Sequence, residues 1–371
     1  MKILYDHQIF STQIYGGISR YFIELMKNIE NNDEIKYELS LEYSNNYYIK
    51  QLSNFSCRSF FKNYDFKKRD RIIDYLNKIL SKNIISKEDY DIFHPTYYNP
   101  YFLDCIGKKP FVLTIYDMTH EVLTDYFHYN DKVAEHKKLL ALKADKIITI
   151  SENTKKDIVK FYNLSEKKIK VIHLASSFTE FNMDKINNVN IKHKLPKKYI
   201  LYVGSRWGYK NFYNFIKAIS LLLKTDNDLF VVCAGGGNFN ENEKELLRGL
   251  SMKDKVFQFH TDDEELQALY KNALAFIFPS LYEGFGIPIL ESFACECPVI
   301  CSKTSSLPEV AGDAAVYFEP ESELSILNSV QKVIYNNNLR SLLVYKGSQR
   351  VKEFSWEKTT KKTKKIYEDI L

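Results

Sequence analysis

Two glutamates that flank a glycine-rich turn are the side chains of this sequence best suited to hold a polar ligand. The run Pro279–Glu291 leads from a short apolar strand pattern into a helix, with Glu283 in the turn and Glu291 in the helix. Gly284 and Gly286 let the backbone approach a ligand closely, and the helix amino terminus offers N–H groups to a phosphate. A carboxylate at each end of this anion site can accept hydrogen bonds from the hydroxyls of two sugars. The pattern favours a ligand that carries both phosphate and sugar, and the alternative for each glutamate is a helix cap or a solvated charge.

Two cations occur in another loop of the same half of the chain. Arg206 and Lys210 follow the apolar run Tyr199–Val203, and Gly204 begins the turn between that run and the cations. We expect both cations to neutralise a diphosphate and the negative charge that grows on it when it leaves in a transfer reaction. Either residue alone could instead be a surface charge on a turn.

The first half of the chain supplies weaker candidates. Gly16 and Gly17 open a helix and could admit a phosphate or an acceptor, but they lack the G-x-G-x-x-G spacing of a nicotinamide or flavin enzyme. Asp117 and His120 follow an apolar run, and each could orient a sugar hydroxyl. The other histidines near strand ends are expected to be structural, because a single histidine is more often a satisfied core residue than a ligand; they are His94, His173 and His260.

Short apolar runs that end in polar residues or glycine alternate with helical periods along the whole chain. This alternation predicts an α/β protein with two doubly wound parallel sheets. The polar stretch Ser176–Lys198 interrupts the alternation and predicts the link between a domain of residues 1–185 and a domain of residues 186–356. The expected strands are Ile3–Tyr5, Asp91–His94, Phe111–Tyr116, Lys146–Ile150, Lys170–His173, Tyr199–Val203, Leu229–Cys233, Val256–Phe259, Ala275–Phe278, Val299–Cys301 and Ala315–Phe318. The candidate side chains follow strands, where the ligands of open parallel sheets bind.

The net charge of +5 is spread along the chain, which argues against a nucleic-acid-binding protein. One segment, residues 62–87, alternates Lys and Arg with Ile, Leu and Tyr in an amphipathic helical pattern. Such a helix can lie on an anionic membrane surface, or it can pack on its own domain with a solvated charged face. The sequence has no run of eighteen apolar residues and no signal-peptide pattern, so we expect a cytoplasmic protein, peripheral at the inner face of the membrane if this segment binds lipid.

The cysteines are scattered, and the cluster of Cys295, Cys297 and Cys301 has no His or Cys partner at zinc spacing. We therefore expect reduced, buried thiols, no structural disulfide and no metal site.

The sequence resembles glycosyltransferase family four over the range Ile3 to Trp356. The segment from Glu291 through Pro298 to Val310 follows the family pattern as well. The motifs that carry the resemblance are the glutamates seven residues apart (Glu283, Glu291), the strand-end glycine followed by Arg and Lys (Gly204, Arg206, Lys210) and the early glycine turn (Gly16, Gly17). One position departs from the pattern, because many members have His directly before the aspartate equivalent to Asp117, where this chain has Tyr116; His120 is the candidate substitute.

The resemblance implies the GT-B architecture, in which two Rossmann-like domains face a central cleft. The amino-terminal domain would bind the acceptor and be completed by a helix over residues 357–371, and the carboxyl-terminal domain would bind a nucleotide-diphosphate sugar. The implied catalytic residues are Glu283, Arg206, Lys210, Asp117 and His120. The implied donor-binding residues are Gly16, Gly17, Gly204, Arg206, Lys210, Glu283, Gly284, Phe285, Gly286, Ile287 and Glu291.

The resemblance further implies a hexosyltransferase that retains the anomeric configuration and needs neither metal nor cofactor. The expected acceptor is a glycan or lipid-linked hydroxyl, and the expected role is the synthesis of a cell-surface polysaccharide or glycoconjugate. Two alternatives are a sugar-nucleotide epimerase of similar shape and a catalytically silent subunit that only binds sugar nucleotide.

Overall fold

The chain is organised in two compact units. The computed structural model describes residues 1–31, 34–61, 66, 68–178 and 195–371. The first unit combines Met1–Leu174 with Ser355–Leu371, and the second is Ala175–Phe354. The boundary expected between residues 185 and 186 lies outside the described residues, whereas the units divide between residues 174 and 175.

The first unit contains parallel strands in two groups. Strand β1 lies between β2 and β3, and β5 lies between β4 and β6. A parallel bridge between Phe93 and Phe111 connects the two groups. The strands are β1 (Lys2–Asp6), β2 (Lys36–Ser40), β3 (Ile92–His94), β4 (Val112–Ile115), β5 (Lys146–Thr149) and β6 (Ile169–Val171).

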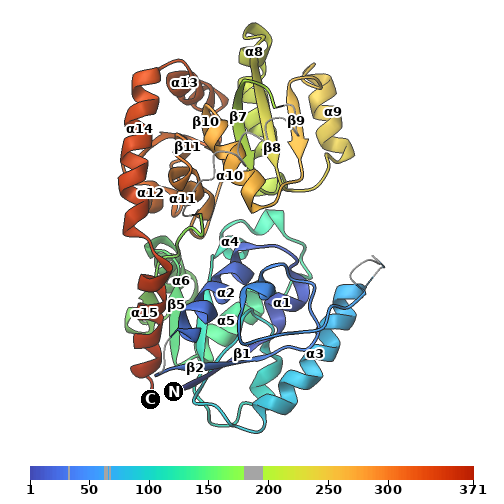
Figure 1. Ribbon diagram of the computed structural model, residues 1–371, viewed down its shortest axis with the longest axis vertical. Coiled ribbons are helices and arrows are strands. Elements are labelled where there is room, and N and C mark those ends of the chain that lie inside the picture. Colours follow the sequence, from blue (N-terminus) through green and yellow to red (C-terminus); the bar gives the residue numbers. More distant parts are fainter. Residues whose placement is uncertain (32–33, 62–65, 67, 179–194) are drawn as a thin grey trace. The chain divides into compact units, whose positions relative to one another are not determined.

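Helices surround these strands, and the last helix of the chain is one of them (Figure 1). That helix, α15 (Trp356–Glu368), packs on α2 (Gly17–Glu30). Its Tyr367 is fully buried, with the hydroxyl 2.6 Å from His94 Nδ1 and 3.0 Å from the Tyr5 hydroxyl. The other α-helices are α1 (Gln8–Thr12), α3 (Arg69–Ile85), α4 (Thr119–Val122), α5 (Val133–Lys143) and α6 (Glu152–Tyr162), and the 3-10 helices are η1 (Tyr48–Gln51), η2 (Pro100–Asp104), η3 (Thr124–Tyr126) and η4 (Glu166–Lys168).

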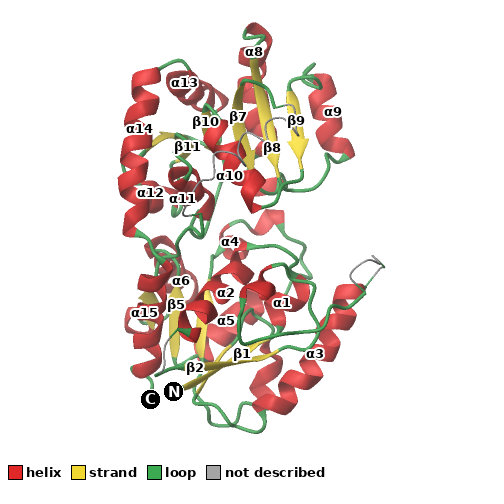
Figure 2. Cartoon of the chain, viewed as in Figure 1, coloured by secondary structure: helices red, strands yellow, loops and turns green. Residues whose placement is uncertain are grey.

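The second unit is built on one six-stranded parallel sheet in the order β12-β11-β10-β7-β8-β9. Strands β7, β8 and β9 lie side by side in Figure 2. The strands of this unit are β7 (Lys198–Val203), β8 (Leu229–Ala234), β9 (Val256–Phe259), β10 (Ala275–Phe278), β11 (Val299–Ser302) and β12 (Ala315–Phe318). Its helices are α8 (Phe212–Thr225), α9 (Glu241–Gly249), α10 (Asp263–Asn272), α11 (Ile287–Ala294), α12 (Leu307–Ala311), α13 (Glu323–Ile334), α14 (Asn337–Arg350), η5 (Gly208–Lys210) and η6 (Val351–Glu353).

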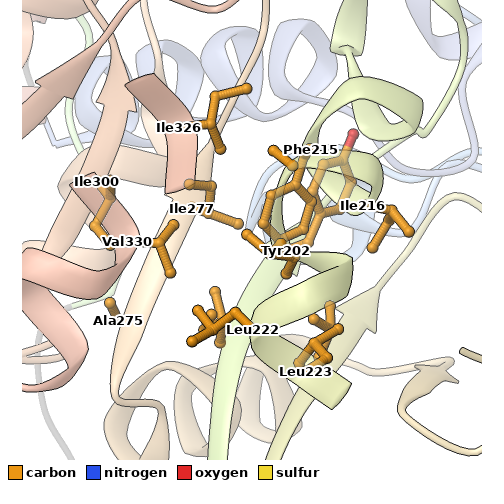
Figure 3. Close-up of a cluster of buried hydrophobic side chains, with 14 of the residues drawn as sticks. Tyr202, Phe215, Ile216, Leu222, Leu223, Ala275, Ile277, Ile300, Ile326 and Val330 are labelled. Atoms are coloured by element: carbon orange, nitrogen blue, oxygen red, sulfur yellow. The ribbon is translucent and has the colours of Figure 1, made fainter. Parts of the chain in front are cut away.

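Apolar side chains on both faces of this sheet are covered by helices, which fits strands that read as continuous apolar runs. One face packs against α8 and α13, and Figure 3 shows Tyr202 and Ile277 of the strands meeting Phe215 of α8 and Val330 of α13. On the other face the Tyr270 ring of α10 lies 5.3 Å from the Phe276 ring. The predicted α/β class with two sets of parallel strands is confirmed.

The sequence patterns missed strand β2. This strand lies at the edge of its group and reads Lys-Tyr-Glu-Leu-Ser, with its first three residues exposed or half-buried. An edge strand that is half exposed lacks the continuous apolar run of a strand buried on both faces.

Candidate active site

The strand order of the second unit defines where a ligand can enter. Strand β7 pairs with β8 on one side and with β10 on the other. The chain continues from β8 to β9 on one side of β7 and from β10 to β12 on the other, so the strand order reverses between β7 and β10. Open parallel sheets bind ligands in the crevice beyond the carboxyl ends of the strands at such a reversal. The loops that follow β7 and β10 carry Lys210 and Glu283, so two of the predicted residues lie at this position.

Lys210 and Glu283 form an ion pair. Lys210 Nζ lies 2.6 Å from Glu283 Oε1, and the side chains are 22% and 14% exposed. The Lys210 ammonium also lies 5.1 Å from the centre of the Tyr209 ring. Both charged groups thus reach the surface, where an incoming ligand can contact them.

The turn that carries Glu283 is held by hydroxyl groups from the loop after β11. The Glu283 backbone N–H donates to Ser305 Oγ at 2.9 Å, and Ser306 Oγ donates to the Glu283 carbonyl at 2.8 Å. Thr304 Oγ1 donates to the Leu281 carbonyl at 2.9 Å. Because these bonds go to backbone atoms, they fix the turn and leave the Glu283 carboxylate available for other partners.

A further backbone bond joins the turn to the loop after β7. The Leu281 N–H donates to the Tyr209 carbonyl at 2.8 Å, one residue before Lys210. The two loops that carry the ion pair are therefore tied together by main-chain geometry as well as by charge.

Helix α11 begins immediately after this turn. Its amino-terminal cap is Gly286 with φ +113°, a conformation that L side chains rarely adopt, and an added Cβ would lie 3.0 Å from Leu307. Ile287 is the first residue of the helix. Phe285 is buried, with its ring 5.9 Å from Phe354, so its backbone and not its side chain could meet a ligand. Gly284 precedes it in the same turn.

Glu291 lies near the middle of α11 and is mostly buried. It accepts a hydrogen bond from the Tyr270 hydroxyl at 3.2 Å, and burial raises the pKa of Tyr270 well above its ordinary value, so this phenol stays a donor. Tyr270 is thus a partner of Glu291 that the sequence patterns did not reveal.

Arg206 differs from the expectation that it would face a diphosphate. The residue is 3% exposed, and its Nη1 and Nη2 atoms donate to the carbonyls of Gly235 at 2.9 Å and Gly237 at 2.8 Å. Nη2 also lies within 3.3 Å of the Gly236 and Asn238 carbonyls. The guanidinium therefore joins the loop after β7 to the loop after β8. Gly204 begins the β7 loop, and its N–H donates to the Ala234 carbonyl at 2.8 Å.

Glu243 is the charged partner of Arg206. Its Oε1 accepts from Arg206 Nε at 3.0 Å, and Oε2 accepts the Asn240 N–H at 2.8 Å in the capping box that starts α9. Both side chains of the ion pair are almost fully buried. One carboxylate thus holds both Arg206 and the beginning of a helix.

The first unit holds the predicted Asp117 and His120 after β4. The Asp117 carboxylate accepts the Thr119 N–H at 2.9 Å. Burial alone would raise the pKa of Asp117, but the positive charge of Lys137 and the Thr119 hydrogen bonds lower it overall, so this carboxyl group is ionised at neutral pH. His120 stacks on Phe127 at 3.8 Å, and its Nδ1 is buried with no hydrogen-bond partner in the described part of the chain.

Burial lowers the pKa of His120, so its imidazole is neutral at pH 7. Its Nε2 lies 3.5 Å from Asp131 Oδ2. Tyr116, which stands where the resembled family often has His, is buried, and its hydroxyl donates to the Thr96 carbonyl at 3.3 Å.

Lys137 holds the segment that carries Asp117 and Glu121, although the sequence patterns did not indicate a role for this lysine. Its side chain is 1% exposed, and Nζ donates to Glu121 Oε2 and to the Asp117 carbonyl, both at 2.9 Å. A lysine in a helix is normally a surface charge, so only the folded packing could reveal this role.

The Gly16-Gly17 turn opens α2 in the first unit. An added Cβ at Gly16 would lie 2.3 Å from Gln13 Oε1, and that oxygen accepts the Ser19 N–H at 3.3 Å. The first turn of α2 is thus already in contact with a side chain of this unit.

Some residues that sequence reasoning missed in the second unit lie in helices, namely Glu243 of α9 and Tyr270 of α10, and others lie in strand-end loops. The glycine run Gly235–Gly237 follows β8, and the hydroxyl run Thr304–Ser306 follows β11. Both loops follow strands of the sheet, which is the signal that could have identified them, because ligands of open parallel sheets bind beyond strand ends.

Two family models match the chain on either side of the boundary between the units. The model described as Glycosyltransferase Family 4 matches residues 15–175, and the model described as Glycosyl transferases group 1 matches residues 184–350.

Individual proteins are similar over the whole chain or a large part of it. The O-antigen chain mannosyltransferase B of Escherichia coli is 27% identical, with 95% of each chain covered. The O-antigen chain mannosyltransferase RfbU of Salmonella typhimurium is 32% identical over 53% of each chain. Among solved structures, Anabaena HepE in complex with UDP and glucose has a TM-score of 0.77 and 14% identity over 100% of both chains, and this likeness concerns the fold.

Proposed function

The chain belongs to the glycosyltransferases that join a Family 4 domain to a group 1 domain, and on that premise we propose that it transfers a hexose from a nucleotide-diphosphate sugar to a glycan or lipid-linked hydroxyl. Similarity to two O-antigen mannosyltransferases makes mannose the first donor sugar to test and cell-surface polysaccharide synthesis the proposed role.

The Lys210–Glu283 pair carries this proposal. It lies at the strand reversal of the second unit, and its two charges are complementary to the two ends of a sugar diphosphate. Lys210 would leave Glu283 to contact the diphosphate, and the Glu283 carboxylate would then meet the positive charge that develops on the sugar. Glu291 would accept hydrogen bonds from the ribose hydroxyls as well as from the Tyr270 hydroxyl.

We also propose that the transfer retains the anomeric configuration without a protein nucleophile, as the family resemblance implies. The bond from the anomeric carbon to the phosphate oxygen breaks while a bond from that carbon to the acceptor oxygen forms on the same face. The acceptor proton passes to the leaving phosphate, so atoms and charge balance without a covalent enzyme intermediate. The protein contributes positioning and electrostatic stabilisation.

We also propose that Lys210 makes a metal ion unnecessary, because it supplies positive charge where a divalent cation would otherwise act. Treatment with EDTA is expected to leave the transfer rate unchanged. A rate that EDTA abolishes and Mn²⁺ or Mg²⁺ restores would contradict this part of the proposal.

Contact with a membrane surface is supported by α3. Its buried residues include Asn77 and Ser81, while Ile72, Tyr75 and Ile79 are exposed by 41%, 64% and 53%. These three apolar residues therefore face outward beside Arg71, Lys78 and Lys82, as in a helix that lies on an anionic bilayer, while Ile73 and Ile85 pack inward on the domain. Residues 62–65 and 67 of the basic segment lie outside the described residues, and within the described ranges no helix is long and apolar enough to span a bilayer.

Flotation with anionic and with neutral vesicles tests this contact. The wild-type chain should float with the anionic vesicles, and Tyr75→Ser with Ile79→Ser should remain at the bottom of the gradient. Leu324→Ser removes an equally exposed apolar side chain from the second unit and should change nothing. Equal flotation of all chains would remove the assignment of α3.

The activity itself is tested by incubation with isotopically labelled GDP-mannose and UDP-sugars. Transfer, or slow hydrolysis of the donor, is expected. Isomerisation at the second sugar carbon would indicate an epimerase, and binding with neither reaction would indicate a silent partner subunit.

The two glutamates then separate donor binding from chemistry. Glu291→Gln should weaken the nucleoside diphosphate and the donor by a similar factor. Glu283→Gln should keep nucleoside diphosphate affinity while kcat falls by about 10²-fold, as for an interaction made mainly in the transition state. Calorimetry and steady-state kinetics make the comparison, and a Glu283→Gln enzyme with normal kcat would contradict the assigned role.

A further inference from the structure

Strand β2 forms an open edge of the first unit. It pairs in parallel with β1 along one side, and no strand of the described residues pairs with its other side. The Lys36 N–H points toward β1, because it donates to the Met1 carbonyl at 2.8 Å. Since backbone groups alternate in direction along a strand, the N–H and the carbonyl of Tyr37 point outward. Within the described ranges neither group has a hydrogen-bond partner, so the edge offers a donor and an acceptor to another strand.

A groove runs along this edge. Its volume is about 710 Å³, and its lining includes the five consecutive residues Ile35–Leu39 together with Asn54 and Phe55. Successive side chains of a strand point to opposite faces of the sheet, so a cavity that contacts all five residues must pass an edge of the strand. Because β1 already occupies one edge, the groove lies along the other. It is thus the space that a further strand would enter.

The far wall of the groove is held in place by Glu30 of α2. Its carboxylate accepts the backbone N–H groups of Ser53 and Asn54, both at 3.1 Å, and the Tyr37 hydroxyl donates to the same carboxylate at 2.7 Å. One side chain therefore joins the strand to the opposite wall. Because the groove is formed before any partner arrives, little conformational entropy is lost when a strand enters it.

The charges on either side of Tyr37 are complementary to themselves under a two-fold rotation. Lys36 is exposed and has no ion-pair partner in the described part of the chain, and Glu38, which contacts Lys2 at 2.8 Å, has 37% of its side chain exposed. In an antiparallel pairing of two β2 strands centred on Tyr37, position 36 of each strand lies opposite position 38 of the other. Opposite charges on facing residues stabilise such a pairing. Each Lys36 would then pair with Glu38 of the partner subunit.

The same register satisfies the free backbone groups. Two Tyr37 residues that lie opposite each other form a hydrogen-bonded pair, in which each N–H donates to the other carbonyl. A shift by two residues, the smallest that keeps outward backbone groups opposite each other, would place Lys36 opposite Lys36 or Glu38 opposite Glu38. Like charges directly opposite each other are unfavourable, so the charges and the backbone select one register.

We propose that two copies of this chain associate through their β2 strands in this antiparallel, two-fold pairing, so that the sheets of the two copies become continuous. A second copy is the partner that fits, because the charges and the backbone groups of the edge both match themselves. The inference rests on β2 alone and is independent of the proposed transfer reaction.

Sedimentation equilibrium of the full chain over a concentration series tests the pairing. The wild type should form a dimer that dissociates on dilution. Lys36→Glu brings like charges together at both facing pairs, and so does Glu38→Lys, so each variant should dimerise at least about tenfold more weakly. The chain with both substitutions exchanges the two charges and should dimerise as the wild type does.

A mixture of the two single variants gives the sharpest result. Each variant repels its own copy, but the two chains are complementary to each other, so the mixture should form a heterodimer. Lys138→Glu is the matched control, because it makes the same charge change at an exposed position of α5 and should leave the dimer unchanged. Circular dichroism and thermal unfolding confirm that each variant is folded before the masses are compared.

A wild-type chain that stays monomeric up to about 100 µM overturns the proposal, because a pairing with a weaker dissociation constant would not assemble the chain. A dimer that Lys36→Glu and Glu38→Lys both retain at wild-type strength would place the contact elsewhere and also overturn it. Folded single variants that stay monomeric when mixed would contradict the antiparallel register, and an edge that pairs only with an added peptide would assign β2 to another protein.

Discussion

Both units place charged groups beyond the ends of parallel strands, but they use them differently. In the second unit Lys210 and Glu283 are 22% and 14% exposed, and the Glu283 turn is fixed through backbone hydrogen bonds. In the first unit Lys137 and Glu121 are 1% and 7% exposed, and the lysine itself holds the Asp117 carbonyl. The charges of the second unit are therefore accessible to a ligand, whereas the buried charges of the first unit stabilise the fold.

This difference separates residues that act on a ligand from residues that support the site. A buried ion pair that loses one partner leaves an uncompensated charge, so its variants should report on stability. A surface pair fixed by main-chain bonds can lose a side chain without loss of fold, so its variants should report on binding and rate.

The largest effect is expected from removal of the last helix. Truncation after Phe354 keeps the ring that contacts Phe285 and deletes the fully buried Tyr367 with its contacts to His94 and Tyr5. The first unit should lose its cooperative thermal transition, and the second unit should keep its nucleoside diphosphate affinity, because its core contains no residue of α15. Calorimetric unfolding scans and isothermal titration measure the two properties. A truncated chain with an intact first transition would show that α15 is dispensable.

Lys137→Met should destabilise the first unit by about 3–5 kcal/mol, the usual cost of removing one partner from a buried ion pair. Nucleoside diphosphate affinity should be unchanged in the molecules that remain folded. Lys138→Met provides the control, since this neighbouring lysine is exposed. Urea unfolding gives the free energies, and equal stability of the two variants would contradict a supporting role for Lys137.

Lys210→Ala should weaken nucleoside diphosphate binding and slow transfer by about 10²-fold, because a preorganised positive charge at the leaving group is lost. The midpoint of thermal unfolding should move little, in contrast to Lys137→Met. Lys244→Ala, which removes an exposed lysine of α9, should have no effect on either property. Normal kinetics in Lys210→Ala would remove the diphosphate assignment.

Arg206→Lys tests the smallest difference, that between a brace and a phosphate ligand. A lysine keeps the charge but cannot reproduce the forked contacts to Gly235, Gly237 and Glu243. We expect about tenfold weaker nucleoside diphosphate binding in both Arg206→Lys and Glu243→Gln, and no further loss in the double variant, because the pair acts as a unit. Calorimetry makes the comparison. Full affinity in Glu243→Gln beside a large loss in Arg206→Lys would instead place Arg206 on the phosphate.

The sequence predicted those features of the site that depend on the local pattern of residues. The glycine turn at Gly286 and the strand-end position of Lys210 could be read from the sequence, because backbone freedom and strand order depend on local pattern. The burial of Arg206 could not, since it depends on the carbonyls of a loop thirty residues away and on Glu243. The burial of Lys137 could not be predicted for the same reason, because it depends on Glu121 in another helix. Edge strand β2 could not be predicted because its polar residues break the apolar pattern of a strand.

The inclusion of α15 in the first unit has a consequence for the order of events during synthesis. Residues 1–174 leave the ribosome first but lack the helix that fills their core, whereas residues 175–354 form a complete unit of their own. The later segment should therefore reach its native state while the earlier one still waits for its final residues. In the folded first unit the Glu34 backbone carbonyl accepts from the Met1 ammonium, and the Glu34 carboxylate pairs with Lys364 of α15. The first unit is therefore complete only when α15 has been synthesised.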